Sequence, residues 1–98
     1  MSAEVEDMFK RIMNHKGVKG LIIINSDGIA IKTNLDNETT VNYAALIHGL
    51  FLKTKSTIKE INPSDNLEQI RLRSFKHEIL VAPSPEYLLI CIQDPLMK

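Results

Sequence analysis

The sequence predicts an α+β protein: a five-stranded antiparallel sheet with a short N-terminal helix on one face and a long helix on the other. Apolar residues recur at helical spacing in two segments, 3–15 and 38–61. Five other short segments are rich in aliphatic and β-branched residues, which is typical of strands. Only short turns separate the last three of these segments, which favours an antiparallel meander.

Segment 3–15 is predicted to be an amphipathic helix. Its acidic residues come first and its basic residues last, which suits the helix dipole. Ser2 is a candidate N-cap, and Gly17 is a natural stop. The apolar positions of this helix are Val5, Met8, Phe9, Ile12 and Met13.

Segments 18–25 and 28–34 are predicted to form a hairpin. Asp27-Gly28 between them favours a type I′ turn, because that turn requires positive φ. The first strand, with its run from Leu21 to Ile24, is apolar at both parities, as expected of a strand covered on both faces.

Segment 38–61 is predicted to be one long helix, capped by Asp36 or Asn37. A second, thinner apolar stripe lies nearly opposite the main one, beside His48; a helix with a single buried face has no need of it. The main face comprises Tyr43, Leu46, Ile47, Leu50, Phe51, Ile58 and Ile61, and the second stripe comprises Val41, Ala45 and Leu52.

The remaining strands are predicted at 66–73, 76–83 and 86–93. In the first of these strands apolar residues alternate with polar ones, whereas the other two strands are apolar at both parities. Strands that are apolar on both faces belong in the middle of a sheet covered on both sides. The hairpin and the meander can then join only through the first and last strands, which gives the order 2-1-5-4-3.

This topology leaves two surfaces unpaired. Strand 66–73 becomes an edge with open N–H and C=O groups. The long helix keeps its second stripe, and one two-fold contact between identical chains would cover both. The short helix is too small to cover the sheet alone, so apolar surface on its side remains for another partner.

Composition sets the class of protein. Ninety-eight residues make one domain, 1–98, and the formal net charge is zero, which argues against general nucleic-acid binding. The N-terminus does not resemble a secretory signal, and the apolar runs are too short to span a bilayer. A single cysteine fits a reducing compartment. We therefore expect a cytosolic protein that binds neither nucleic acid nor membrane.

No set of catalytic groups converges in the sequence, so we predict no enzymatic activity, no metal and no cofactor. Segment 49–56 is similar to a phosphate-binding loop, but Thr54 replaces the second glycine and the segment lies within a helix. Cys91 is expected to act as a small core residue. Arg71 and Arg73 can grip an acidic group, although a solvated face or ion pairs across a dimer is the simpler interpretation.

Three stretches resemble the roadblock family of dynein light chains: "HKGVKGLIIINSDGIAIKT", "NPSDNLEQIRLRSFKHEILVAP" and "YLLICIQDP". The resemblance runs from about Glu4 to Pro95. It implies a non-enzymatic protein of roadblock or profilin-like fold that dimerises through its third strand and long helix. The two sheets would then form one ten-stranded sheet.

The resemblance also implies interface residues. The positions that match the dimer-forming strand are Leu67, Gln69, Ile70, Arg71 and Arg73. To these we add Ala45, His48 and Leu52 from the second helix stripe. Phe75 departs from the family pattern, which has a small or basic residue in that turn, and we expect it to influence the choice of homodimer or heterodimer.

The implied partners are a second roadblock chain, dynein intermediate chains and, indirectly, the heavy-chain complex. The implied locations are the cytoplasm and cytoskeleton, or a cilium axoneme. We expect partner binding on the side of the short helix, at Glu4, Asp7, Met8 and Arg11. The alternative is a roadblock scaffold or regulator of a small GTPase, and a profilin-like actin binder is a third hypothesis.

Overall fold

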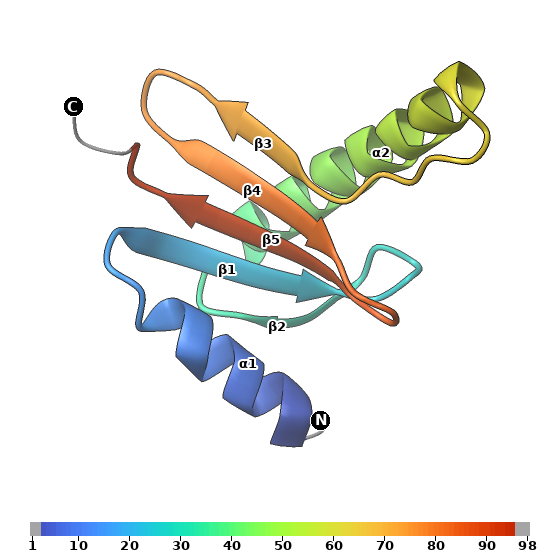
Figure 1. Cartoon of the computed structure of the whole chain (residues 1–98). Helices are drawn as coiled ribbons and strands as arrows, with labels where there is room; N and C mark the ends of the chain where they lie inside the picture. The colour runs from blue at the N-terminus through green and yellow to red at the C-terminus, as the bar shows by residue number, and fades with distance from the viewer. Residues whose placement is uncertain (1–2, 96–98) are drawn as a thin grey trace.

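The computed structural model describes residues 3–95 and contains two helices and five strands in that range (Figure 1). The sheet is antiparallel and its order is β2-β1-β5-β4-β3, as predicted. The elements are α1 (Ala3–Met13), β1 (Val18–Ile24), β2 (Ala30–Thr33), α2 (Asn37–Ile61), β3 (Ile70–Arg73), β4 (Glu78–Pro83) and β5 (Leu88–Gln93).

The helices lie on opposite faces of the sheet, and they cover different parts of it. Helix α2 crosses one face, and its C-terminal half extends past β3, beyond the edge of the sheet (Figure 1). Between α2 and the sheet lies an apolar core, because one face of every strand contributes to it. The buried members of that core are Ile22, Ile24, Ala44, Ile47, Val81, Leu88 and Ile90.

Helix α1 packs on the other face, against β1 (Figure 1). Val5 is buried there. The Lys32 Nζ atom lies 3.0 Å from an oxygen of Glu6 and 4.9 Å from the centroid of the Phe9 ring. These contacts fasten α1 to β2, while the face over β5, β4 and β3 is left without a helix.

The β1–β2 hairpin differs from the prediction. A type I′ turn needs positive φ at both central residues, yet only Gly28 has it in this hairpin, with φ of 84°. The Gly28 N–H donates to the Asn25 carbonyl, and the Asn25 side chain accepts from the N–H groups of Asp27 and Ile29. Asn25 thus stabilises a turn that ends in a glycine bulge, and the strand register shifts after Ile23.

Helix α2 begins as predicted, with Asp36 as the N-cap. The Asp36 carboxylate accepts a hydrogen bond from the Thr39 N–H at 2.7 Å. The helix ends at Ile61, where the Asn62 N–H donates to the Ile58 carbonyl. The cap predicted for the first helix, Ser2, lies outside the described residues.

The predicted buried face of α2 is partly wrong. Its buried residues are Thr40, Ala44 and Ile47, whereas Leu46 and Ile61 are 67% and 76% exposed. Leu50 is exposed as well. The sheet covers only a narrow arc of the helix, and the broad apolar face drawn from the sequence extends beyond that arc.

Strand β3 is shorter than the predicted 66–73, so Leu67 and Gln69 precede it in an irregular segment. The register explains the late start, because Ile70 is paired with Val81. Two residues earlier, Glu68 would lie opposite Pro83 at the end of β4, which has no N–H to donate to a ladder.

Candidate partner-binding surfaces

Strand β3 forms an unpaired edge in the described structure. It is the last strand in the sheet order and pairs only with β4. Its half-buried residues Ile70 and Leu72 join the core beneath α2, and Arg71 and Arg73 are exposed on the opposite face. An edge of this kind offers backbone donors and acceptors to an added strand.

Exposed apolar residues lie on both flanks of α2. We call Val41, Ala45 and Leu52 the turn flank, and Leu46, Leu50 and Ile61 the edge flank. At 100° per residue the two flanks lie on either side of the buried face. The turn flank is the second apolar stripe that the sequence predicts. The residues of the edge flank belong to the main apolar face, which the sequence predicts to be buried.

The contact between His48 and Gly28 shows which way each flank points. A Cβ on Gly28 would lie 2.7 Å from the His48 Nδ1, so the imidazole sits directly on the β1–β2 turn. His48 borders the turn flank, which therefore faces that turn. The edge flank faces the other way, towards the side of α2 on which Figure 1 shows β3.

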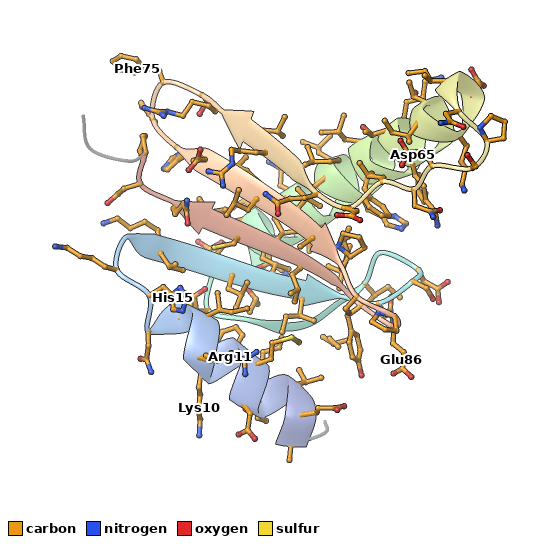
Figure 2. All side chains as sticks on the ribbon, in the orientation of Figure 1. Lys10, Arg11, His15, Asp65, Phe75 and Glu86 are labelled. Carbon is orange, nitrogen blue, oxygen red and sulfur yellow. The ribbon has the colours of Figure 1, made fainter. Side chains whose placement is uncertain are left out.

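A cleft lies between α1 and the β4–β5 turn, with a volume of about 540 Å³. We call it the α1–turn cleft. Helix α1 lines it with Glu4, Val5, Asp7, Met8 and Arg11. The turn lines it with Ser84, Pro85, Glu86 and Tyr87. Figure 2 shows Arg11 on α1 and Glu86 at the turn.

The chain that carries these surfaces matches a known protein family. A family model described as the Roadblock/LC7 domain matches residues 4–94. The chain belongs to the Roadblock/LC7 family. The roadblock resemblance in the sequence is thereby confirmed over nearly the whole length.

Solved structures with the same fold share little sequence with this roadblock chain. A Roadblock/LC7 domain from Streptomyces avermitilis is 15% identical, with a TM-score of 0.79 over 88% of this chain and 73% of that one. The gliding protein MglB from Thermus thermophilus is 13% identical, with a TM-score of 0.78 over 96% and 76%. An MglB with a tetrameric arrangement is 12% identical, with a TM-score of 0.80 over 96% and 75%. At such identities the likeness shows the fold alone.

The roadblock fold separates the predicted interface residues. Arg71 and Arg73 are on the β3 edge with Ile70, while Leu67 and Gln69 precede it. Phe75 is 99% exposed at the tip of the β3–β4 turn (Figure 2). On α2, Ala45, His48 and Leu52 lie on or beside the turn flank rather than the edge flank. Their part in an interface stays a prediction.

The four residues predicted to bind a partner do come together. Glu4, Asp7, Met8 and Arg11 all line the α1–turn cleft. The sequence did not indicate that the β4–β5 turn would form the opposite wall. From the sequence, Pro85 is predicted to lie in the connection between strands, and Glu86 and Tyr87 at the start of the last strand.

A buried carboxylate on the sheet was missed from the sequence. Glu78 is 3% exposed and accepts hydrogen bonds from Arg71 at 2.9 Å and from Gln93 at 2.8 Å. The Gln93 amide and then the Arg71 guanidinium hold the pKa of Glu78 below its ordinary value, against the opposing effect of burial. Arg71 is thus paired within its own chain. The signal was an acidic residue at the start of one strand, opposite two arginines on its neighbour.

The sheet face opposite α2 carries an apolar track, which we call the open face. It consists of the half-buried residues Leu80, Ala82, Leu89 and Cys91. Leu80 pairs with Cys91 and Ala82 with Leu89, so all four side chains point to one face. Burial raises the pKa of the Cys91 thiol, which makes a thiolate nucleophile less available.

The described residues contain no cluster suited to bind a metal ion. Between residues 3 and 95, no three His, Cys, Asp or Glu side chains gather in a way that could hold one. The segment similar to a phosphate loop, 49–56, lies inside α2. In the same range, no helix is long and apolar enough to cross a membrane.

Proposed function

We propose that this roadblock protein is a non-catalytic dimeric scaffold that regulates a small GTPase. The observation that carries the proposal is the unpaired β3 edge lying beside the apolar edge flank of α2. Two chains related by a two-fold axis at β3 would pair these strands and join two five-stranded sheets into one. Residues 3–95 offer surfaces for assembly rather than a set of convergent catalytic groups.

The dimer contact follows from what each chain leaves uncovered. Pairing β3 with its copy would satisfy the open N–H and C=O groups of both edges. Because α2 extends past β3, each helix would reach over the partner's sheet. The edge flanks, with Leu46, Leu50 and Ile61, would then face each other and lose their contact with water.

A small GTPase is proposed as the partner because this fold also occurs in proteins that are not described as dynein subunits. Solved structures that this chain resembles include bacterial proteins, among them a gliding protein. The fold therefore serves in proteins outside dynein motors. The joined sheets of the proposed dimer would offer one continuous surface to such a partner. We place this activity in the cytoplasm.

A dynein light chain is the second candidate. It is favoured by the three sequence stretches that resemble roadblock light chains, including the Lys-Gly-Val-x-Gly segment that leads into β1 and forms its first residues. In that case the dimer would bind dynein intermediate chains and, through them, join the heavy-chain complex on the cytoskeleton or in a cilium axoneme.

Nucleotide-dependent capture separates the two candidates. The tagged protein is incubated with extract of its native cell, supplemented with either GDP or a non-hydrolysable GTP analogue, and the captured proteins are quantified by mass spectrometry. We expect one small GTPase to be enriched in one nucleotide state only. Leu46→Glu serves as a second bait, because a scaffold that works as a dimer should lose this partner when the edge flank is charged.

Three outcomes would contradict all or part of this proposal. Stoichiometric dynein intermediate chain, captured equally in both nucleotide conditions, would establish the second candidate instead. Recovery of neither a GTPase nor a dynein subunit would contradict both. Capture of the GTPase by a Leu46→Glu protein that sediments as a monomer would retain the partner and refute the dimer as the binding unit.

A further inference from the structure

We propose that the α1–turn cleft binds an amphipathic segment of the partner that carries a lysine or arginine at one end. The inference rests on the proposed function, because it assigns to the scaffold a docking site with a defined ligand chemistry. It depends on three features of the cleft: an apolar floor, an uneven set of charges and an apolar track that leads out of it.

The floor of the cleft suits a long side chain. Val5 is buried at its base, and Met8, Pro85 and Tyr87 line the walls. A volume of about 540 Å³ falls within the usual range of ligand pockets. Methionine adapts to irregular ligands, and tyrosine offers a ring face to a cation. The aliphatic stem of lysine or arginine can lie on such a floor while its charged head remains at the rim.

The charges at the rim select a cation. Glu4, Asp7 and Glu86 supply three carboxylates, and Arg11 supplies one positive charge. None of the four takes part in a salt bridge within residues 3–95, so all are available to a ligand. Arg11 lies one helical turn beyond Asp7 and repels a second cation, so it favours placing the basic group near Glu4 and Asp7.

The open face gives the segment its apolar side. Tyr87 precedes β5 and by alternation points to the same face as Leu89, which pairs with Ala82. The track then continues through Leu80 and Cys91. No helix covers it in the described structure (Figure 1). A segment whose basic end enters the cleft would thus lay apolar residues along the sheet, as an amphipathic helix does in a groove.

Two synthetic peptides test the inference. Both have the same leucine stripe, and one carries lysine where the other carries glutamate at a single end. Each is titrated into the full ¹⁵N-labelled chain at low salt, and amide shifts are followed. We expect shifts in residues 4–11 and 84–89, and roughly tenfold tighter binding of the lysine peptide, because charge complementarity discriminates between partners.

A matched pair of variants provides the control. Asp7→Lys should weaken binding of the lysine peptide by roughly fivefold, since it replaces an attractive charge by a repulsive one. Glu60→Lys makes the same kind of change on the exposed side of α2 and should leave binding unchanged. Circular dichroism confirms that both variants fold.

Three results would overturn the inference: equal binding of the two peptides, shifts confined to α2 and β3, or no effect of Asp7→Lys. Shifts in the cleft that appear on raising protein concentration without peptide would assign it to a second copy of the chain. A GTPase that is captured unchanged by the Asp7→Lys protein would refute the cleft and leave the proposed function intact. A cleft that binds the lysine peptide, in a protein that captures no GTPase, would refute the function alone.

Discussion

Gly28 shows how a single residue fixes the end of the β1–β2 hairpin. Its φ of 84° lies in the left-handed region, and the ring of His48 occupies the space that a side chain would need. An alanine here would suffer both a backbone and a steric penalty. The position also brings α2 close to the turn, because the His48 side chain of that helix lies against Gly28.

Gly28→Ala should therefore lower the free energy of unfolding by at least about 1–2 kcal/mol, measured by urea denaturation. Gly49→Ala is the matched control: Gly49 lies in α2 with no atom near its missing Cβ. That substitution should instead stabilise the helix by about 0.5–1 kcal/mol. Equal effects of the two changes would contradict this view of the turn.

Glu78 makes stability depend on pH. Hydrogen bonds from Gln93 and Arg71 hold its folded-state pKa below the ordinary value of 4.5, so the unfolded chain takes up the proton at a higher pH than the folded one. The stabilisation is complete above the ordinary value and is lost as the pH falls through the lower folded value.

Glu78→Gln removes this titration. The variant should have a lower urea midpoint than the parent at pH 7, and the gap should narrow by pH 3. Comparing the two proteins matters because the pKa of Asp36 is lowered too, by hydrogen bonds from Thr39, and this group contributes equally to both. A gap that stays constant from pH 7 to pH 3 would show that Glu78 has no linkage to folding.

At the scale of elements, α2 contributes both to the core and to the exposed apolar surface. A narrow arc of the helix packs on the sheet, and apolar side chains on its two flanks are exposed to water. The edge flank lies towards β3 and the turn flank towards the β1–β2 turn, so a contact at the β3 edge should involve the edge flank more strongly.

Leu46→Glu and Leu52→Glu test this directly. Both residues are at least half exposed, so both variants should fold. Sedimentation should show that Leu46→Glu weakens the dimer by about tenfold or more, because a charge enters an apolar contact, while Leu52→Glu has a smaller effect. The reverse order would assign the interface to the turn flank, as the sequence predicts.

The elements also show what the sequence could predict. Strand order was predictable because β1, β4 and β5 are apolar at both parities, and only one arrangement puts all three inside. The buried arc of α2 could not be predicted in the same way. Helical periodicity identifies the apolar residues of a helix, but it does not show how wide a surface the sheet offers them. The pairing of Glu78 and the wall of the α1–turn cleft depend on contacts distant in sequence, which local patterns do not encode.

At the scale of the whole molecule, the β3 edge predicts concentration-dependent hydrogen exchange. In dilute protein, the outward amides of residues 70–73 should exchange quickly, because no strand pairs with them in the described chain. In concentrated protein the same amides should become protected while those of β5 stay unchanged. Fast exchange at every concentration, in protein that sediments as a dimer, would show that the dimer forms elsewhere.

The central pairing of β1 with β5 has a consequence for how the chain is made. The two strands are adjacent in the sheet but lie near opposite ends of the sequence. During synthesis the apolar β1 emerges well before β5, and until β5 follows only β2 can pair with it in the sheet. Non-local pairing of this kind slows folding and leaves an aggregation-prone strand exposed in the meantime. Production of this protein in the cell should therefore depend on chaperones that shield nascent chains, even though the finished molecule hides the apolar run of β1 completely.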